Sequence, residues 1–230
     1  MKSLIIKTIV GVLALSIVTF ANTLPKLAYK QYKISKDSNP TVHRLVKEGG
    51  ELVYPKPRKA RKLLVEALRK VSKGAKIDKY DYLWTQYGLL KSAMESGTSK
   101  YGPGTRADYM KVAKNVMKFL DHENVGEWQF TELGAFQMEV CREAGNGLGW
   151  ELMEEGKKLK TALQYTKKAE DCMRGEEDYF IYDTKVRILL KMKKKNKAYT
   201  IVKQILNKDP DFGDFQDIKH SKSYRKWLKK

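Results

Sequence analysis

Apolar side chains recur at helical spacing along most of the chain after Pro57. An α-helix has about 3.6 residues per turn, so apolar residues three and four positions apart lie on one face and are buried together. The first such face carries Ala60, Leu63, Leu64, Ala67, Leu68 and Val71. Further helices are predicted over the ranges 78–97, 105–120, 126–144, 147–155, 159–173, 178–192 and 195–208. No convincing run of alternating apolar and polar residues indicates a strand, and we therefore expect an all-α protein.

Local signals indicate where several of these helices begin and end. Asp78 is a predicted N-cap, and Thr105 with Asp108 three residues later resembles a capping box. The six prolines lie outside the periodic segments, so we expect uninterrupted helices between them. The glycines within 145–149 predict a loose junction between two helices. Short polar connections indicate that consecutive helices are antiparallel neighbours, which predicts an array of helix pairs.

The first residues have the features of an export signal. Residues 1–21 combine a basic start with an apolar run and small residues at its end, which predicts a signal peptide cleaved after Ala21. The competing interpretation is an uncleaved membrane anchor, because the uncharged stretch 8–24 has 17 residues, near the lower limit for spanning a bilayer. Either way, we expect the folded part outside the cytoplasm, as a periplasmic, secreted or anchored protein. Residues 22–55 are predicted to form a tether with one short helix around 42–47, and residues 56–230 are predicted to form the helical domain.

The chain is strongly basic, with a formal net charge of +19. Such a charge attracts anionic partners over long distances, whether nucleic acid, phospholipid headgroups or an acidic protein. Export disfavours nucleic acid. The alternative to an anionic partner is that the lysines form a solvated coat that keeps the protein soluble.

Two cysteines, Cys141 and Cys172, each lie in a predicted helix and form no metal-binding motif. We expect two buried free thiols. In an exported chain, an oxidising compartment would permit one disulfide between neighbouring helices.

The most specific pattern lies in residues 146–210. The segment 147–156 followed by 159–169, and the segment 182–190 followed by 197–210, carry small residues at matching places. Ala162 and Ala169 are seven residues apart, Ala198 repeats the first position 36 residues later, and Pro210 follows that alanine by 12 residues. These two segments resemble tetratricopeptide repeats (TPRs), whose period is about 34 residues.

The resemblance also covers the end of the chain. Its last apolar residues resemble the helix that caps such arrays: Phe212, Phe215, Ile218, Tyr224, Trp227 and Leu228. Upstream of residue 146 the repeat register is not recognisable, because Met94 and Trp128 stand where small residues are expected. The resemblance implies antiparallel helix pairs stacked as a short TPR-like solenoid. It also implies a scaffold that binds a protein or peptide, as an assembly factor or as an inhibitor of its partner.

Two groups of residues are candidates for partner contacts. The aromatic group is Tyr80, Tyr82, Trp84 and Tyr87, whose rings cannot all face one core stripe, because neighbours two apart differ by about 200° around a helix. Partial burial between helices is the alternative for them. The basic group is expected to face an anionic surface such as a phospholipid membrane, and it comprises Arg58, Lys59, Arg61, Lys62, Lys222, Arg225 and Lys226.

The sequence carries no recognised catalytic or cofactor-binding motif. The three histidines, His43, His122 and His220, lie far apart, so we predict no metal site, no cofactor and no enzyme. The expected function is an exported TPR-like scaffold that binds a protein or peptide partner, and an acidic partner would suit its basic charge. The alternatives are a membrane-anchored basic protein that binds anionic lipid and a hydrolase with an unrecognised site.

Overall fold

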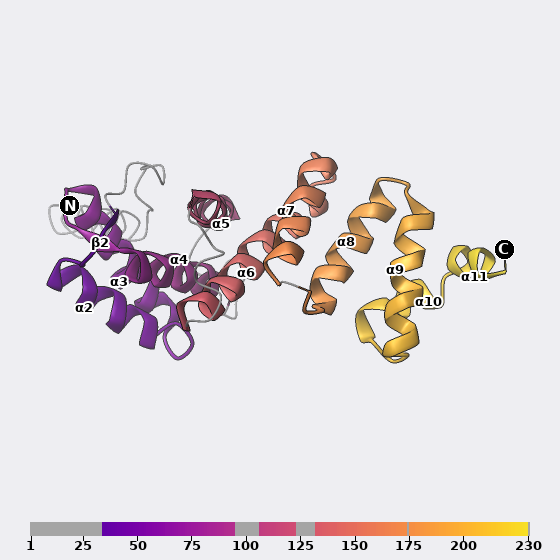
Figure 1. Ribbon diagram of the computed structural model, residues 1–230, viewed down its shortest axis with the longest axis horizontal. Coiled ribbons are helices and arrows are strands. Elements are labelled where there is room, and N and C mark those ends of the chain that lie inside the picture. Colours follow the sequence, from indigo (N-terminus) through magenta and orange to yellow (C-terminus); the bar gives the residue numbers. More distant parts are fainter. Residues whose placement is uncertain (1–33, 95–105, 123–131, 174, 230) are drawn as a thin grey trace, which may run out of the picture. The chain divides into compact units, whose positions relative to one another are not determined.

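The structure, a computed structural model, describes residues 34–94, 106–122, 132–173 and 175–229 (Figure 1). These residues are mainly helical, and the strands among them are two short segments that pair with each other, so the all-α prediction is confirmed. Two compact units divide at Glu123 and Asn124, although the sequence predicted one helical domain over 56–230. We refer to them as the N-terminal and C-terminal units.

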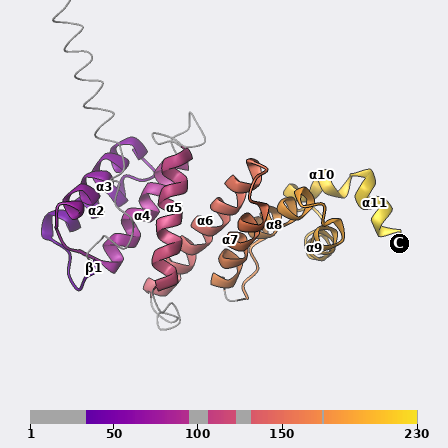
Figure 2. The ribbon, with the colours of Figure 1, turned by 90° about the horizontal axis from the view of Figure 1, so that it is seen from above.

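In its described residues, the N-terminal unit has four helices and one short parallel strand pair. Helix α2 packs against α3 and α4, and α4 also packs against α5 (Figure 2). Asp78 caps α4 as predicted, because its Oδ1 accepts a hydrogen bond of 2.7 Å from the Asp81 backbone N–H. Thr105 lies outside the described residues, so its predicted capping box is not seen. The elements are β1 (Ile34–Ser35), α2 (Pro40–Glu51), α3 (Pro57–Ser72), β2 (Ile77–Asp78), α4 (Lys79–Met94) and α5 (Arg106–His122).

Helix α2 extends beyond the short helix predicted inside the tether. It begins at Pro40, where proline favours the first helical turn, and the Asn39 side chain accepts a hydrogen bond of 3.0 Å from the Thr41 backbone N–H. Val42 and Val46 are one turn apart and are buried at 0% and 3% exposure. Residues 40–51 therefore belong to the folded body, and the prediction of a tether over 22–55 is wrong for them.

The C-terminal unit is a row of helices followed by a short helical tail. Helix α6 packs against α7, α8 packs against both, and α9 packs against α8 (Figure 1). Helices α7, α8 and α9 lie within one residue of their predicted limits at each end. The elements are α6 (Glu132–Glu154), α7 (Leu159–Cys172), α8 (Tyr179–Lys191), α9 (Lys195–Lys208), the 3₁₀ helix η3 (Gly213–Phe215), α10 (Gln216–Lys219) and α11 (Lys222–Leu228).

Helix α6 runs without a break through the glycines of 145–149, so the predicted junction there is wrong. The glycines serve close packing instead. A Cβ built on Gly149 would lie 2.1 Å from Thr166 Oγ1, and one on Gly145 would lie 3.0 Å from Ala169 Cβ. Only glycine at these positions lets the α6 backbone approach α7 without displacing its neighbours.

Cys141 on α6 and Cys172 on α7 form a disulfide with a Cα–Cα distance of 6.3 Å. The prediction of free thiols is therefore wrong. Helices α6 and α7 are antiparallel and closely packed, which brings the two cysteines together across a sequence separation of 31 residues.

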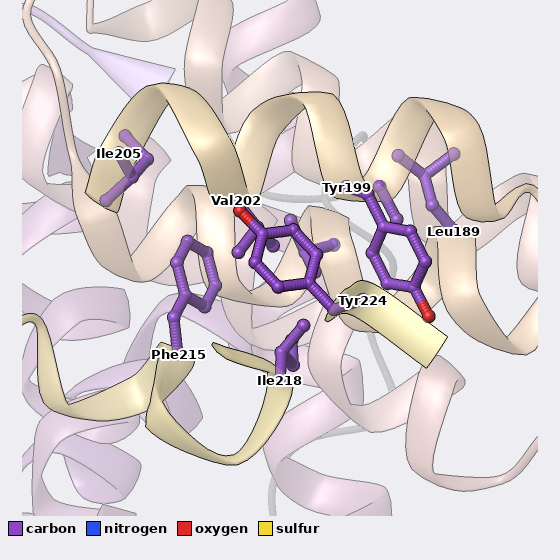
Figure 3. Close-up of a cluster of buried hydrophobic side chains, with 9 residues drawn as sticks. Leu189, Tyr199, Val202, Ile205, Phe215, Ile218 and Tyr224 are labelled. Carbon is purple, nitrogen blue, oxygen red and sulfur yellow. The ribbon is translucent and has the colours of Figure 1, made fainter. Parts of the chain in front are cut away.

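The chain end after α9 covers the last helix pair. Tyr199 Oη donates a hydrogen bond of 2.7 Å to Ser223 Oγ, and the rings of Tyr199 and Tyr224 lie 5.2 Å apart. The tail forms η3, α10 and α11 in place of a single helix. Figure 3 shows the shared core, in which the tail residues Phe215, Ile218 and Tyr224 pack against Leu189, Tyr199, Val202 and Ile205.

Candidate functional site

A groove of about 1040 Å³ lies between α7, α8 and α9 of the C-terminal unit. Helix α8 packs against both α7 and α9 (Figure 1). The lining residues of α7 and α9 therefore form the two walls of the groove, and those of α8 form its floor. The groove is lined by Lys160, Leu163, Gln164, Lys167, Glu170, Asp171, Gly175, Glu176, Tyr182, Lys185, Leu189, Met192, Lys194, Lys197, Thr200 and Ile201.

The sequence of α7 explains how this wall arises. Ala162, Thr166 and Ala169 are all fully buried. Residues at positions such as 160, 163, 164 and 167 recur at helical spacing on a different face, so they line the groove. Close packing of the small residues against α6 thus fixes the direction in which the groove residues point.

The middle of the groove is apolar. Leu189 on α8 is 4% exposed and belongs to the buried core of the C-terminal unit. Leu163, Tyr182 and Ile201 pack against this core and remain partly accessible. The groove therefore offers apolar surface to a ligand without exposing the core itself.

The charged side chains of the lining are five lysines and three carboxylates. Lys185 Nζ donates a hydrogen bond of 2.5 Å to Glu170 Oε2 and lies 5.9 Å from the centre of the Tyr182 ring. The other four lysines are exposed and form no ion pair with any residue that the structure describes; they are Lys160, Lys167, Lys194 and Lys197. Among the described residues, the groove thus presents four cationic side chains without an ion-pair partner around an apolar floor.

Tyr182 adds a polar group beside this floor. Burial raises the pKa of its phenol, and the carboxylates of Glu170 and Glu177 raise the pKa further. The hydroxyl therefore stays protonated at neutral pH and is able to donate a hydrogen bond to a ligand.

Most of the predicted aromatic group is not a binding surface. Tyr82 is fully buried and packs on Phe119 with ring centres 5.0 Å apart, and Tyr87 is 8% exposed. Trp84 is partly buried and touches the rings of both Tyr80 and Tyr87. Tyr80, at 47% exposure, is the exposed member of the group. The predicted contact with a partner is therefore wrong for Tyr82, whose ring completes the core of the N-terminal unit.

The predicted basic group also contains one buried residue and several exposed ones. Arg61 is 1% exposed, and its Nη2 donates a hydrogen bond of 3.1 Å to Asp108 Oδ2. Burial lowers the pKa of Arg61, and Asp108 opposes this shift. The prediction that Arg61 faces an anionic surface is wrong, because it lies on the buried side of α3. The other members are exposed: Arg58, Lys59 and Lys62 on α3, and Lys222, Arg225 and Lys226 on α11.

The groove is not evident from the sequence. Lys194 and Lys197 fall in the lysine-rich stretch 191–197, which the sequence alone does not distinguish from a solvated lysine coat. Lys160 and Lys167 are seven residues apart, the same spacing as Ala162 and Ala169 on the buried face of α7. This repeated spacing indicates that Lys160 and Lys167 share a second face of α7. The residues of α8 and α9 that complete the groove can be identified only from the fold.

The histidines and the predicted membrane segment were also compared with the structure. In the ranges that the structure describes, no group of three or more metal-ligating side chains is found. His43 Nδ1 lies 3.0 Å from Asp81 Oδ2 and links α2 to α4, whereas the His122 side chain lies outside the described residues. Among the described helices none is long and apolar enough to cross a bilayer, and the predicted signal or anchor segment 8–24 is not described.

Comparison of the chain with protein-family models, curated proteins and solved structures found no match, so the groove is interpreted from its own residues.

Proposed function

We propose that this chain is an exported, TPR-like scaffold that holds a segment of a partner protein in the groove between α7, α8 and α9. The observation that carries the proposal is the combination of an apolar floor with four exposed lysines in the lining that form no ion pair with a described residue. An extended or helical peptide fits such a surface, because its apolar side chains cover the floor and its acidic side chains meet the lysines. Holding the segment would make the chain an assembly factor or an inhibitor of that partner.

The packing of the C-terminal unit supports its repeat character. Helices α6 and α7 form one antiparallel pair, and α8 and α9 form the next. Ala162, Ala169 and Ala198, the small residues that carried the resemblance, are all fully buried. The tail from η3 to α11 covers α9, as the cap of a repeat array does.

The disulfide supports export. Disulfides persist in oxidising compartments and are rare in the cytosol. The Cys141–Cys172 bond joins α6 to α7 within one helix pair. The bond therefore supports a location outside the cytoplasm, and the signal-like residues 1–21 support the same location.

The shape and charge of the groove favour a peptide over a lipid surface. A bilayer presents a flat layer of headgroups, whereas these lysines line a concave surface with a partly buried floor. The lining also carries three carboxylates, which would repel anionic headgroups. A protein segment can place apolar side chains on the floor and charged side chains beside the lysines and carboxylates of the lining.

Site-specific photo-crosslinking in the native envelope tests the proposal. A photoreactive residue replaces Gln164, which lines the groove and is exposed. The matched control replaces Lys203, which is exposed on α9 and does not line the groove. We expect position 164 to yield one crosslinked protein in stoichiometric amount and position 203 to yield none.

Two results would overturn this function. Equal crosslinking from positions 164 and 203 would mean that the partner does not occupy the groove. Crosslinking of position 164 to lipid alone would favour the membrane-bound alternative.

A further inference from the structure

We infer that the groove selects a peptide segment whose charges are segregated, with carboxylates at one end, apolar residues in the centre and basic residues at the other end. This inference rests on the proposed function and adds the chemical class of its ligand. It follows from an unequal distribution of charge along the groove.

One end of the groove is basic. Helix α7 begins at Leu159, α8 ends at Lys191 and α9 begins at Lys195. Because α7 and α9 are both antiparallel to α8, these three helix ends lie at the same end of the groove. Lys160, Lys194 and Lys197 are placed there, are exposed and have no ion-pair partner within the described ranges.

The other end of the groove is acidic. Helix α7 ends at Cys172 and α8 begins at Tyr179, so the lining residues around this connection lie at the opposite end. Asp171 and Glu176 are exposed in the lining, and neither forms an ion pair with a described residue. These two carboxylates are available to basic side chains of a ligand.

The centre between the two ends contributes little net charge. Lys185 and Glu170 neutralise each other through their hydrogen bond of 2.5 Å. Leu189 in the floor and Leu163 and Ile201 in the walls are apolar, and Lys167 is exposed beside them and forms no ion pair with a described residue. The centre therefore favours apolar side chains of a ligand, with one carboxylate tolerated next to Lys167.

This distribution disfavours two other occupants. A second copy of the chain also carries a net charge of +19 and is repelled as a whole. A nucleic-acid strand carries phosphates along its full length, and its charges would meet Asp171 and Glu176. A charge-segregated peptide avoids both penalties.

Fluorescence anisotropy with the full chain tests the inference. The probes are labelled peptides with a leucine-rich centre and charged ends: glutamate then lysine, lysine then glutamate, or glutamate at both ends. A single-stranded oligonucleotide serves as a further probe. Long-range attraction to a basic protein favours the all-acidic peptide and the oligonucleotide. We expect a charge-segregated peptide to bind about tenfold more tightly than either, which corresponds to about 1.4 kcal/mol.

Charge-reversal variants assign this preference to the groove. Asp171→Lys with Glu176→Lys should invert it, so that the all-acidic peptide binds best. The control, Glu154→Lys with Asp211→Lys, makes the same change in net charge at exposed residues outside the groove lining and should keep the wild-type order. Unchanged circular dichroism melting shows that each variant is folded.

Three outcomes would overturn the inference: equal or tighter binding of the all-acidic peptide or the oligonucleotide, an unchanged preference in the Asp171 and Glu176 variant, or no measurable peptide binding. If crosslinking from position 164 succeeds while this test fails, the scaffold function stands and only the ligand class is wrong. If crosslinking fails, the proposed function itself is contradicted.

Discussion

Gly149 on α6 faces Thr166 on α7 so closely that a Cβ at position 149 would lie 2.1 Å from the threonine hydroxyl oxygen. The threonine is fully buried, and its hydroxyl donates a hydrogen bond of 3.1 Å to the Ala162 carbonyl oxygen. The first helix pair of the C-terminal unit thus depends on the absence of a side chain at one position. The same contact sets the orientation of α7 and, through it, one wall of the groove.

Gly149→Ala should destabilise the C-terminal unit by about 1–3 kcal/mol, because the added methyl group overpacks the α6–α7 interface. The sign is diagnostic, since the same change within an unconstrained helix stabilises by roughly 0.5–1 kcal/mol. Urea unfolding followed by circular dichroism measures the effect. Combining it with Thr166→Ala should recover part of the loss. A stabilised Gly149→Ala variant would contradict the close approach.

Reduction of the Cys141–Cys172 disulfide should lower the free energy of unfolding of the C-terminal unit by about 2–4 kcal/mol. The bond closes a loop across 31 residues and thereby restricts the unfolded chain. Urea unfolding with and without dithiothreitol measures the difference, and the Cys141→Ser, Cys172→Ser variant should be insensitive to the reductant. Equal stability of the oxidised and reduced wild type would refute the contribution of the bond.

Asp183 on α8 should make stability depend on pH. Burial raises its pKa to about 6, although the Arg187 guanidinium, 2.8 Å away, opposes the shift. The folded state therefore holds this proton more tightly than the unfolded state, and stability should fall as pH rises through about 6. Relative to Asp183→Asn, the wild type should lose about 1 kcal/mol between pH 5 and pH 7.

Thermal or urea unfolding of both proteins at the two pH values gives this difference directly. Arg187 also donates a hydrogen bond of 3.2 Å to Asp217 on α10, and this pair is present in both proteins. A constant difference between wild type and Asp183→Asn across the range would mean that Asp183 has an ordinary pKa.

Arg61→Ala should destabilise the N-terminal unit by about 3 kcal/mol, because it leaves the partly buried Asp108 carboxylate without this cation. Lys59→Ala, a neighbouring change at an exposed position of α3, should alter stability by less than about 0.5 kcal/mol. Urea unfolding of the two variants provides the comparison. Similar small effects for both would show that Arg61 is not packed in the interior.

Much of the helical architecture could be predicted from apolar periodicity. The limits of α7 and α9 were predicted closely because lysine, glycine and proline mark their ends. The continuity of α6 could not be predicted in this way. Gly145 and Gly149 weaken an isolated helix, and only their contact with α7 shows why they are there.

The candidate site was harder to predict than the fold. Arg61 sits among apolar neighbours on α3, and the sequence does not show that Asp108, 47 residues later, forms its partner. The groove combines side chains from three helices, and their convergence depends on tertiary packing. Lys160 and Lys197 are ordinary surface lysines in the sequence, and only the arrangement of α7 and α9 places them around one apolar floor.

Charge reversal in the groove tests the central claim most directly. The variant Lys160→Glu with Lys197→Glu alters two free cations of the lining. The control, Lys203→Glu with Lys229→Glu, makes the same change in net charge at exposed positions outside it. The measurement is the affinity of each protein for the partner that crosslinks from position 164. If the partner lies in the groove, the first variant should lose affinity about tenfold and the second should change little, a difference of about 1.4 kcal/mol. Equal losses in both variants would contradict this claim, because the partner would then respond to overall charge and not to the groove.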